Sequence, residues 1–412
     1  MAAPDAPMTR WLSIVGLGED GIDGLTPLAG GLIEGAEIVF GGRRHLDFAA
    51  SLVRGAVRPW PSPFSIDPVL AQRGRRVVVL ASGDPMLHGV GATLMRAVPP
   101  AQTHVVPAPS SFSLAAARLG WPLQDCIQLS LHGRPIELIR PHLQSGARIL
   151  ALTSDQSGPA AVAALLTQDG FGPSAMTILE ALGGPRERIR ATTAADFTLT
   201  GVDPLNLLTI KVTALPGARI LPRAPGLPDA LFEHDGQISK RDIRALTISA
   251  LAPRRGDLLW DIGAGSGSIG IEWMLADPTL RTVAIETRLD RADRVRRNAL
   301  AFGVPDLRVV EGAAPQALAG LPAPEAIFIG GGASRPGMLD TVIGALRPGG
   351  RLVVNAITLE TEALLLARHA ALGGQLLRIA ISRAAPVAGM TGWRPAMPVT
   401  QWTWEKPSET QA

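Results

Sequence analysis

The second half of this chain is organised around residues 258–274, which read LLWDIGAGSGSIGIEWM. An apolar run ends at Asp261, glycines follow at positions 263, 265 and 267, and a stretch of helical composition comes next. Glycines in such a turn let the backbone bend sharply and approach a ligand, because no Cβ stands in the way. The pattern predicts a strand, a ligand-binding turn and a helix.

Two nucleotide-type cofactors fit this turn at first sight. Gly265, Gly267 and Gly270 satisfy the G-x-G-x-x-G spacing of dinucleotide sites, and Glu286 lies 21 residues after Gly265, where either cofactor needs an acid for its ribose hydroxyls. Asp261 separates the alternatives, because a carboxylate there repels a pyrophosphate but suits the ammonium group of S-adenosylmethionine. We therefore predict S-adenosylmethionine, held by Asp261, Gly263, Gly265, Gly267 and Glu286.

Two flanking segments extend this prediction. The turn resembles the first motif of class I methyltransferases, and EGAAPQAL at 311–318 resembles their adenine-side loop, which implies contacts from Gly312 and Ala313. HDGQISKRDIRALTISAL at 234–251 resembles the entry segment of the decarboxylating precorrin methyltransferases within that class. The resemblance implies cofactor contacts from Gln237 and Ser239. The residues leave open a direct role for Lys240, and a capping box in which Ser239 caps the next helix and Asp242 is its third residue.

The first half contains a second glycine pattern, GLGEDG at 16–21, again directly after an apolar run. It matches G-x-G-x-x-G, and Glu37 lies 21 residues after Gly16. A dinucleotide site also needs a helix that opens at the third glycine, with its N-terminus facing the pyrophosphate. Gly24 and Pro27 stand where that helix would run. The dinucleotide interpretation of this half is therefore weak.

A different motif decides the first half. ASGDPMLHG at 81–89 follows the apolar run RVVVL and resembles the S/G-G-D-P-x-x-x-G signature of the tetrapyrrole methylases. This class III fold is unrelated to the Rossmann-like methyltransferases. Four more segments match in register, although Glu19-Asp20 replaces the Pro-Gly that is common in the family: GLGE at 16–19, PAPSSFSLAAARLGW at 107–121, LSLHGR at 129–134 (typical of the enzymes acting on precorrin-6Y) and LEALGGPRERI at 179–189.

The tetrapyrrole-methylase resemblance implies a set of site residues. Asp84 also has a structural alternative, since an Asp in such a turn can accept a hydrogen bond from its own loop. The motif GGRRHL at 41–46 offers Arg43, Arg44 and His45 to substrate carboxylates, although His45 can equally be structural. The implied cofactor contacts are Ser82, Gly83, Asp84, Leu87, Ser110, Ser111, Thr153 and Leu182.

The predicted architecture is α/β throughout, in two domains. Apolar runs alternate with stretches of helical composition in both halves, which predicts βα units and largely parallel sheets. Residues 10–213 are expected to form a tetrapyrrole-methylase fold of two α/β subdomains, and residues 230–406 a Rossmann-like class I methyltransferase domain. Four prolines fall within 214–229, at positions 216, 222, 225 and 228, and proline at that density prevents a regular helix or central strand. We place the linker there and expect it to bury little, so that the halves fold independently.

Together the two resemblances imply an enzyme of corrin biosynthesis that binds one S-adenosylmethionine per domain. They imply methylation of the tetrapyrrole precorrin-6Y at carbon 5 by the first domain. The second would methylate carbon 15 and remove the carboxyl of the ring-C acetate, which gives precorrin-8 in cobalamin (vitamin B12) biosynthesis. Two alternatives stay open: another substrate for the second half, such as RNA, or a degenerate cofactor-binding half kept as a scaffold. The sequence identifies no catalytic residue, and leaves open whether the macrocycle carries cobalt and which carbon is methylated first.

Composition narrows the partners and the compartment. The net charge is only +3, without a Lys/Arg run, which argues against a nucleic-acid partner. No stretch approaches the ~18 consecutive apolar residues of a membrane span, and the chain does not begin like a secretory signal. Cys126 is the single cysteine, which suits a reducing cytoplasm. We predict a cytoplasmic enzyme without a metal ion, and the family resemblances imply a homo-oligomer.

Overall fold

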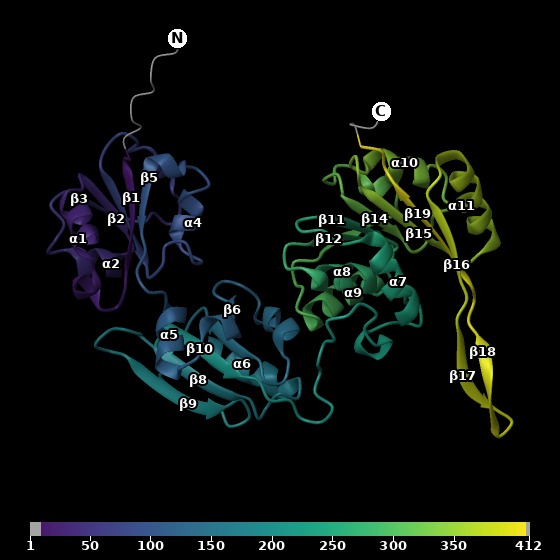
Figure 1. Ribbon diagram of the computed structural model, residues 1–412, viewed down its shortest axis with the longest axis horizontal. Helices are drawn as coiled ribbons and strands as arrows, with labels where there is room; N and C mark the ends of the chain where they lie inside the picture. The colour runs from purple at the N-terminus through teal and green to yellow at the C-terminus, as the bar shows by residue number, and fades with distance from the viewer. Residues whose placement is uncertain (1–9, 409–412) are drawn as a thin grey trace, which may run out of the picture. The chain divides into compact units, whose positions relative to one another are not determined.

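The computed structural model describes residues 10–408, and the chain forms two compact units whose main division lies between Arg219 and Ile220 (Figure 1). The first unit holds two five-stranded sheets, and the second a seven-stranded sheet and a two-stranded hairpin. No helix within 10–408 has the length and hydropathy needed to cross a membrane.

The first subdomain is a parallel sheet of order β3-β2-β4-β1-β5 with helices on both faces. Alternate residues of its strands enter opposite cores: Ile14 and Val79 pack on one face, and Val15 and Val78 on the other. This alternation follows from the two-residue period of a strand. Its elements are β1 (Leu12–Leu17), η1 (Gly21–Gly24), α1 (Pro27–Glu34), β2 (Ile38–Gly41), α2 (Arg43–Ala49), β3 (Ala56–Pro59), α3 (Asp67–Leu70), β4 (Val77–Ser82), α4 (Val90–Leu94), η2 (Pro100–Gln102) and β5 (Thr103–Val106).

The second subdomain departs from the largely parallel sheets expected from the sequence. In the order β6-β7-β10-β8-β9, only β6 and β7 are parallel, and the other neighbours are antiparallel. The apolar runs predict strands but carry no information on strand direction. Its elements are α5 (Ser111–Leu119), η3 (Leu123–Asp125), β6 (Cys126–Ser130), β7 (Arg148–Leu152), α6 (Gly158–Gln168), β8 (Ala175–Glu180), β9 (Arg188–Thr193) and β10 (Asn206–Lys211). Between β6 and β7 lies η4 (Ile136–His142), of which Glu137–Pro141 groups with the second unit.

The second unit is built on a sheet of order β13-β12-β11-β14-β15-β19-β16. The first five strands are parallel, and β19 is antiparallel to both of its neighbours. Its elements are η5 (Asp229–Leu231), α7 (Arg241–Leu251), β11 (Leu258–Ile262), α8 (Ser268–Ala276), β12 (Arg281–Glu286), α9 (Leu289–Ala301), β13 (Arg308–Glu311), η6 (Gln316–Leu318), β14 (Ala326–Ile329), α10 (Met338–Ala345), β15 (Arg351–Ala356), α11 (Leu359–Leu372), β16 (Gln375–Ile379), β17 (Ser382–Val387), β18 (Met390–Pro395) and β19 (Val399–Glu405).

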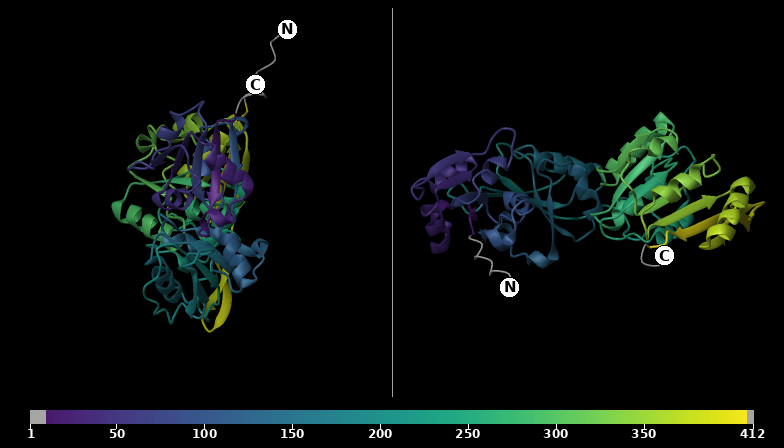
Figure 2. Two further views of the ribbon diagram at one scale, coloured as in Figure 1. Left: turned by 90° about the vertical axis from the view of Figure 1, so that its left-hand side faces the viewer. Right: turned by 90° about the horizontal axis from the view of Figure 1, so that it is seen from above.

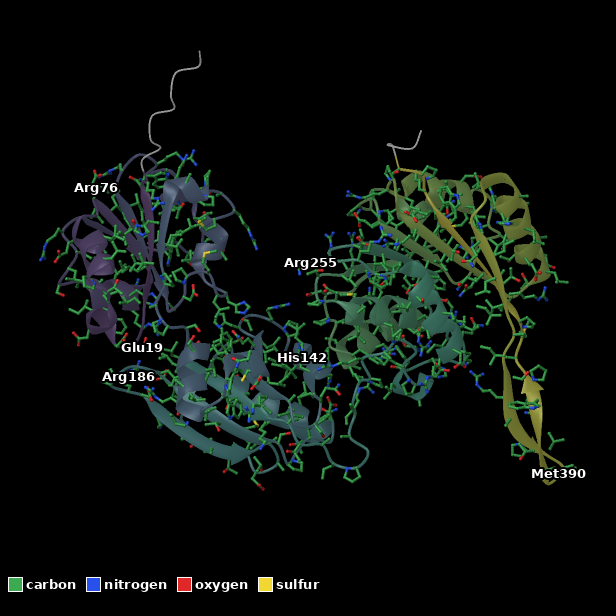
Figure 3. The ribbon with its side chains drawn as sticks, in the orientation of Figure 1. Glu19, Arg76, His142, Arg186, Arg255 and Met390 are labelled. Atoms are coloured by element: carbon green, nitrogen blue, oxygen red, sulfur yellow. The ribbon has the colours of Figure 1, made fainter. Side chains whose placement is uncertain are left out.

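Two hydrophobic cores cover the faces of this sheet. Leu259 of β11 packs with residues of α7, α8 and α9, whereas Trp260 and Ile262 pack with residues of α10 and α11. Helices on both faces of a parallel sheet leave a crevice at the carboxyl ends of the strands, where connections leave neighbouring strands in opposite directions. Here that point lies between β11 and β14. The β17–β18 hairpin extends beyond the sheet of its own unit, with Met390 near its tip (Figures 1, 2 and 3).

The predicted linker is more firmly packed than its proline content indicates. From Ile220 onward it groups with the second unit, and Leu221 and Leu227 are buried in that unit's core. The N–H groups of Gly226 and Leu227 donate to the carboxylate of Glu272, which is itself buried. The expectation that 214–229 buries little is therefore wrong for its second part.

Candidate cofactor and substrate sites

The first unit contains a cavity of about 450 Å³ lined by both of its subdomains. Its floor is formed where β1, β2 and β4 end, and its other wall comes from the ends of β7 and β8 and the start of β10. All eight residues predicted as cofactor contacts in this half line the cavity: Ser82, Gly83, Asp84, Leu87, Ser110, Ser111, Thr153 and Leu182.

Several of these side chains already have structural partners. Asp84 accepts a hydrogen bond from the N–H of Met86 at 2.8 Å, so the local turn expected as its alternative role is present. Ser110 caps α5 by accepting from the N–H of Ser113 at 3.1 Å. Thr153 donates to Asn206 at 2.7 Å. A ligand in this cavity would therefore meet backbone groups and apolar walls more than free hydroxyls.

Two glycines let three backbone segments converge beside the cavity. A Cβ on Gly16 would lie 2.0 Å from the carbonyl oxygen of Gly83 and 2.6 Å from the nitrogen of Ala108, so no side chain fits. Gly83 has φ +53°, and its Cβ would lie 3.0 Å from the carbonyl oxygen of Pro109. The first glycine of GLGEDG thus serves close packing. Glu37, the acid of the dinucleotide interpretation, instead accepts from the N–H of Arg76 and lies outside the cavity lining.

A charged cluster stands at one side of this cavity. Arg44 reaches Glu19 at 2.9 Å and donates to Ser82 at 3.3 Å, and His45 lies 3.0 Å from the same hydroxyl. Burial, together with the nearby Arg44 charge, lowers the pKa of His45 to about 4, so the imidazole is neutral near pH 7. Glu19 also reaches Arg186 of the second subdomain at 3.6 Å, and the two are close together in Figure 3. Arg43 is exposed and does not line the cavity.

The second unit contains a larger cavity of about 880 Å³. It opens at the carboxyl ends of β11, β12 and β14, the position expected for a ligand in this fold. Two predicted contacts do not line it. Gly267 turns the chain into α8, where a Cβ would lie 2.8 Å from Val295, and Ala313 is absent from the lining while its neighbours are present. The predicted residues that do line it are Gln237, Ser239, Asp261, Gly263, Gly265, Glu286 and Gly312.

Asp261 is the most deeply buried acid of this cavity, with 1% of its surface exposed. One carboxylate oxygen, Oδ2, accepts from the N–H of Gly270 at 3.0 Å, and the other, Oδ1, is buried with no protein partner among the described residues. Burial raises the pKa of this carboxyl to about 7; the Gly270 hydrogen bond opposes the rise and the charge of Glu286 adds to it. A buried acceptor without a partner is costly, so this oxygen suits a cationic or hydrogen-bonding ligand group.

Glu286 stabilises the turn that carries the glycines. Its carboxylate accepts N–H bonds from Gly265 at 2.8 Å, Thr287 at 2.9 Å and Arg288 at 3.0 Å. A carboxylate has about four acceptor positions, so capacity remains for a ligand hydroxyl. The spacing between Gly265 and Glu286 predicted an acid at this place, but it could not predict these three backbone hydrogen bonds.

Residues 236–240 of the entry segment form one wall of the second cavity. Asp235 accepts from the N–H of Gln237 at 3.1 Å and from Arg291 at 2.9 Å; these bonds, the first most strongly, hold the pKa of its carboxyl well below the usual range. The buried guanidinium of Arg244 donates to the carbonyl oxygens of Ser239 and Leu227 and pairs with Glu272. The capping-box prediction is wrong, because Lys240 is the N-cap of α7 and makes no side-chain cap bond. Ser239 lies one residue before the N-cap of α7.

Some residues that line each cavity were not predicted from the sequence. In the first, His88 and Asn206 line the site. In the second, the loop after β14 contributes Gly330, Gly331, Gly332 and Arg335. A run of three glycines directly after an apolar strand was the available signal. Across residues 10–408, His, Cys, Asp and Glu form no group of three or more that could hold a metal ion.

The two halves match two family models: residues 12–198 match the tetrapyrrole (corrin/porphyrin) methylases, and residues 230–406 match the precorrin methyltransferase domain. A curated protein from a Sinorhizobium species, named precorrin-6Y C(5,15)-methyltransferase [decarboxylating], is 60% identical over 97% of this chain and 98% of its own length. The chain belongs to this family. It is therefore a methyltransferase family member with two different methyltransferase folds, and the family implies S-adenosylmethionine as methyl donor.

Two further relatives are shorter. The probable cobalt-precorrin-6B C(15)-methyltransferase (decarboxylating) of Saccharolobus solfataricus is 39% identical over 33% of this chain and 72% of its own length. The cobalt-precorrin-7 C(5)-methyltransferase of Salmonella typhimurium is 29% identical over 46% of this chain and 96% of its own length. Each of these names refers to one carbon only.

Proposed function

We propose that this chain transfers methyl groups from S-adenosylmethionine to carbons 5 and 15 of precorrin-6Y and removes the carboxyl of one acetate side chain as carbon dioxide. One cofactor binds in each unit. The observation that carries the proposal is the pair of cavities. Each is lined by the motif residues of a different methyltransferase class, within a chain 60% identical over nearly its full length to a curated protein of that name.

The second cavity fits S-adenosylmethionine by charge. Its interior holds two buried acids, Asp261 and Glu286, and one buried oxygen of Asp261 has no partner within residues 10–408. The ammonium group of the cofactor would donate a hydrogen bond to that oxygen, and Glu286 has acceptor capacity left for a ribose hydroxyl. A pyrophosphate would face the same acids unfavourably.

The first cavity fits a cofactor by its volume and by the close approach of its backbone segments. Its volume, about 450 Å³, lies within the range of small-molecule sites. The loop 82–84 and the residues around Ser110 approach closely only because Gly16 and Gly83 have no side chain. We assign Ser82, Gly83, Asp84, Leu87, Ser110, Ser111, Thr153 and Leu182 to this cofactor. Arg44 and His45, at the cavity's charged side, are assigned to substrate carboxylates.

Binding and orientation are the main tasks of the protein in this reaction. When bound, the cofactor supplies a methyl group on a sulfonium, which is already an activated electrophile, and the bridging carbons of the reduced macrocycle are enamine-like nucleophiles. The cavity walls hold the two reactants in line and exclude water. In the second cavity, Phe328, Met338 and Ile379 supply apolar wall. No acid or base for decarboxylation is assigned.

We assign carbon 15 and the decarboxylation to the second unit and carbon 5 to the first. The second unit carries the entry segment that resembles decarboxylating enzymes, and residues 10–213 resemble enzymes that only transfer methyl groups. The two shorter relatives support such a separation, because each is named for one carbon, and decarboxylation accompanies carbon 15. The compartment proposed is the cytoplasm, on the single cysteine, and self-association is proposed from the resemblance.

The test is mass spectrometry of precorrin-6Y incubated with the full chain and S-adenosylmethionine. The proposal predicts a product with two added methyl groups and one carbon dioxide lost. An unchanged substrate, or a product that keeps every carboxyl, would contradict it. Calorimetric titration with the cofactor should give two binding sites per chain, and a single site would favour a scaffold role for one unit.

A further inference from the structure

The second cavity separates its charges by depth. Its two acids, Asp261 and Glu286, are buried, with 1% and 6% of their surfaces exposed. Its lining also includes five cations, of which all but Arg291 are exposed: Lys240, Arg288, Arg291, Arg335 and Arg383. A cationic cofactor suits the acidic interior, which leaves the basic outer part for a ligand of opposite charge.

Three of these five cations are already paired with a carboxylate. Arg288 pairs with Asp290 at 2.9 Å, Arg291 with Asp235 at 2.9 Å, and Arg383 with Asp242. Lys240 and Arg335 have no carboxylate partner among residues 10–408. The guanidinium of Arg335 donates to the carbonyl oxygen of Ala314 at 3.2 Å, and a guanidinium has five N–H donors. Two cations of this cavity are therefore available to an anionic ligand.

The loop that carries Arg335 places it at the crevice between β11 and β14. Gly331, in the loop after β14, lies against Gly263 in the loop after β11; a Cβ on Gly263 would lie 3.3 Å from the Gly331 carbonyl oxygen. Gly332 has φ +80°, and its Cβ would lie 3.4 Å from Nε of Arg335, so the side chain runs back over its own loop. Lys240 enters the same cavity from the entry segment.

Apolar side chains line the cavity together with these cations. Ile357 is 59% exposed and Met397 is 67% exposed, although both line the cavity, and Ile381 lies beside them in the lining. Exposed apolar surface at a cavity with free cations suits a ligand with a broad apolar body and peripheral carboxylates. A tetrapyrrole with acid side chains has this composition.

We propose that Arg335 and Lys240 form the subsite of the second unit that binds a side-chain carboxylate of the macrocycle; this inference rests on the proposed function. The carboxylate they hold is one that the product retains. Pairing with a cation stabilises a carboxylate, whereas loss of carbon dioxide needs the electrons to leave it. The acetate to be decarboxylated is therefore directed elsewhere in the cavity, away from both cations.

The test measures carbon dioxide release by the full chain in two series, one at saturating S-adenosylmethionine with varied precorrin-6Y and one at saturating precorrin-6Y with varied S-adenosylmethionine. Arg335→Gln should raise the KM for precorrin-6Y about tenfold and Lys240→Gln about threefold, as expected for the loss of a charge-assisted hydrogen bond. Changes in kcat and in the KM for S-adenosylmethionine should stay within about twofold. Arg335→Lys should raise the KM for precorrin-6Y less than Arg335→Gln does, because lysine keeps the positive charge although it lacks the planar guanidinium group. Arg347→Gln is the matched control, since this arginine is 57% exposed and lies outside the cavity lining.

Three outcomes distinguish the possibilities. An unchanged KM for precorrin-6Y in the double variant would overturn the subsite, as would an equal rise in the KM for S-adenosylmethionine. Failure of the unsubstituted chain to release carbon dioxide would instead overturn the proposed function. A second measurement needs no variant. Raising the salt concentration from about 0.05 to 0.5 M should weaken the binding of precorrin-6Y more than the binding of S-adenosylmethionine, because salt screens exposed charges. Equal weakening would contradict the subsite.

Discussion

The titration of Asp261 should make cofactor binding in the second unit depend on pH near neutrality. Its carboxyl is 1% exposed, and burial raises its pKa to about 7. A cationic ammonium beside the unpartnered oxygen favours the ionised form, so the protonated fraction must lose its proton when the cofactor binds. With a pKa of about 7, the apparent affinity should rise about eightfold from pH 6 to pH 7.5, and binding at pH 7 should release about half a proton.

The assay is isothermal titration calorimetry in two buffers of different ionisation enthalpy, on the Gly83→Leu chain. Gly83 lines the first cavity, and a leucine there is strained, because residue 83 has φ +53° and its Cβ would lie 3.0 Å from the carbonyl oxygen of Pro109. The substitution should therefore prevent cofactor binding in the first cavity. The upper limit is set at pH 7.5 because the cofactor's own amino group is still mostly protonated there. Asp261→Asn in the same background is the matched control, and its affinity should be lower and nearly independent of pH over this range. An equal affinity at pH 6 and pH 7.5 without the Asn substitution would refute the reasoning.

The same residue gives a stability prediction of defined sign. In the folded chain, burial raises the pKa of Asp261 above its ordinary value of 3.8. Its contribution to stability is therefore fully present below about pH 3.8 and is lost as the pH rises through about 7, by about 4 kcal/mol at most. Bound cofactor should offset this loss. Chemical denaturation of the Asp261→Asn variant should show a smaller fall in the free energy of unfolding between pH 5 and pH 8 than the unsubstituted chain.

Three further predictions follow from particular contacts. Glu286→Ala removes the acceptor of three backbone N–H groups and the ribose contact that we propose. Cofactor affinity in the second unit should therefore fall about ten- to hundredfold, and an unchanged calorimetric affinity would exclude Glu286 as a ligand. Arg244→Lys keeps a charge beside Glu272 but loses the hydrogen bonds to the carbonyls of Ser239 and Leu227. The free energy of unfolding in urea should fall by about 2–4 kcal/mol, and cofactor binding should weaken. Unchanged stability would show that these guanidinium hydrogen bonds are dispensable. Residues 10–219 and 220–408 should fold as separate pieces. A shortened second piece that begins at Leu227 should be about 2 kcal/mol less stable than the one that begins at Ile220, because it lacks buried Leu221. Equal urea midpoints for the shortened and the full second piece would contradict the packing of this segment.

The sequence predicted the positions where backbone conformation is restrictive. Gly83, Gly263 and Gly265 all have positive φ and line their cavities, as their place after apolar strands indicated. The α/β class and the motif-bearing strands were likewise predictable from apolar runs and turns. Gly267 shows the limit of this reasoning: it also has positive φ, but it packs against Val295 and does not reach the cavity.

Long-range pairing explains most of what the sequence did not reveal. The antiparallel direction of β8, β9 and β10 depends on how chain segments return, which the alternation of apolar runs does not encode. The position of Gly226 and Leu227 depends on hydrogen bonds with Glu272 and Arg244, which come later in the chain. Arg335 was missed because its role depends on a loop folding back at Gly332. The cap of α7 moved from Ser239 to Lys240 because the Ser239 carbonyl is bound by Arg244.

The central claim is that two separate sites in one chain methylate two different carbons, and a pair of cavity-filling variants tests it most directly. Gly83→Leu should block the first cavity, and Gly265→Leu, at φ +61° and facing the entry segment, the second. With precorrin-6Y and S-adenosylmethionine carrying a carbon-13 methyl group, NMR and mass spectrometry identify which carbon is methylated and whether carbon dioxide is lost. Gly83→Leu should give a product with one methyl, at carbon 15, and one carboxyl fewer. Gly265→Leu should leave carbon 15 unmethylated, and the two variants mixed should restore the full product. A Gly83→Leu product with both methyls would remove the first unit from catalysis, and one that keeps its carboxyl would contradict the assignment of decarboxylation to the second.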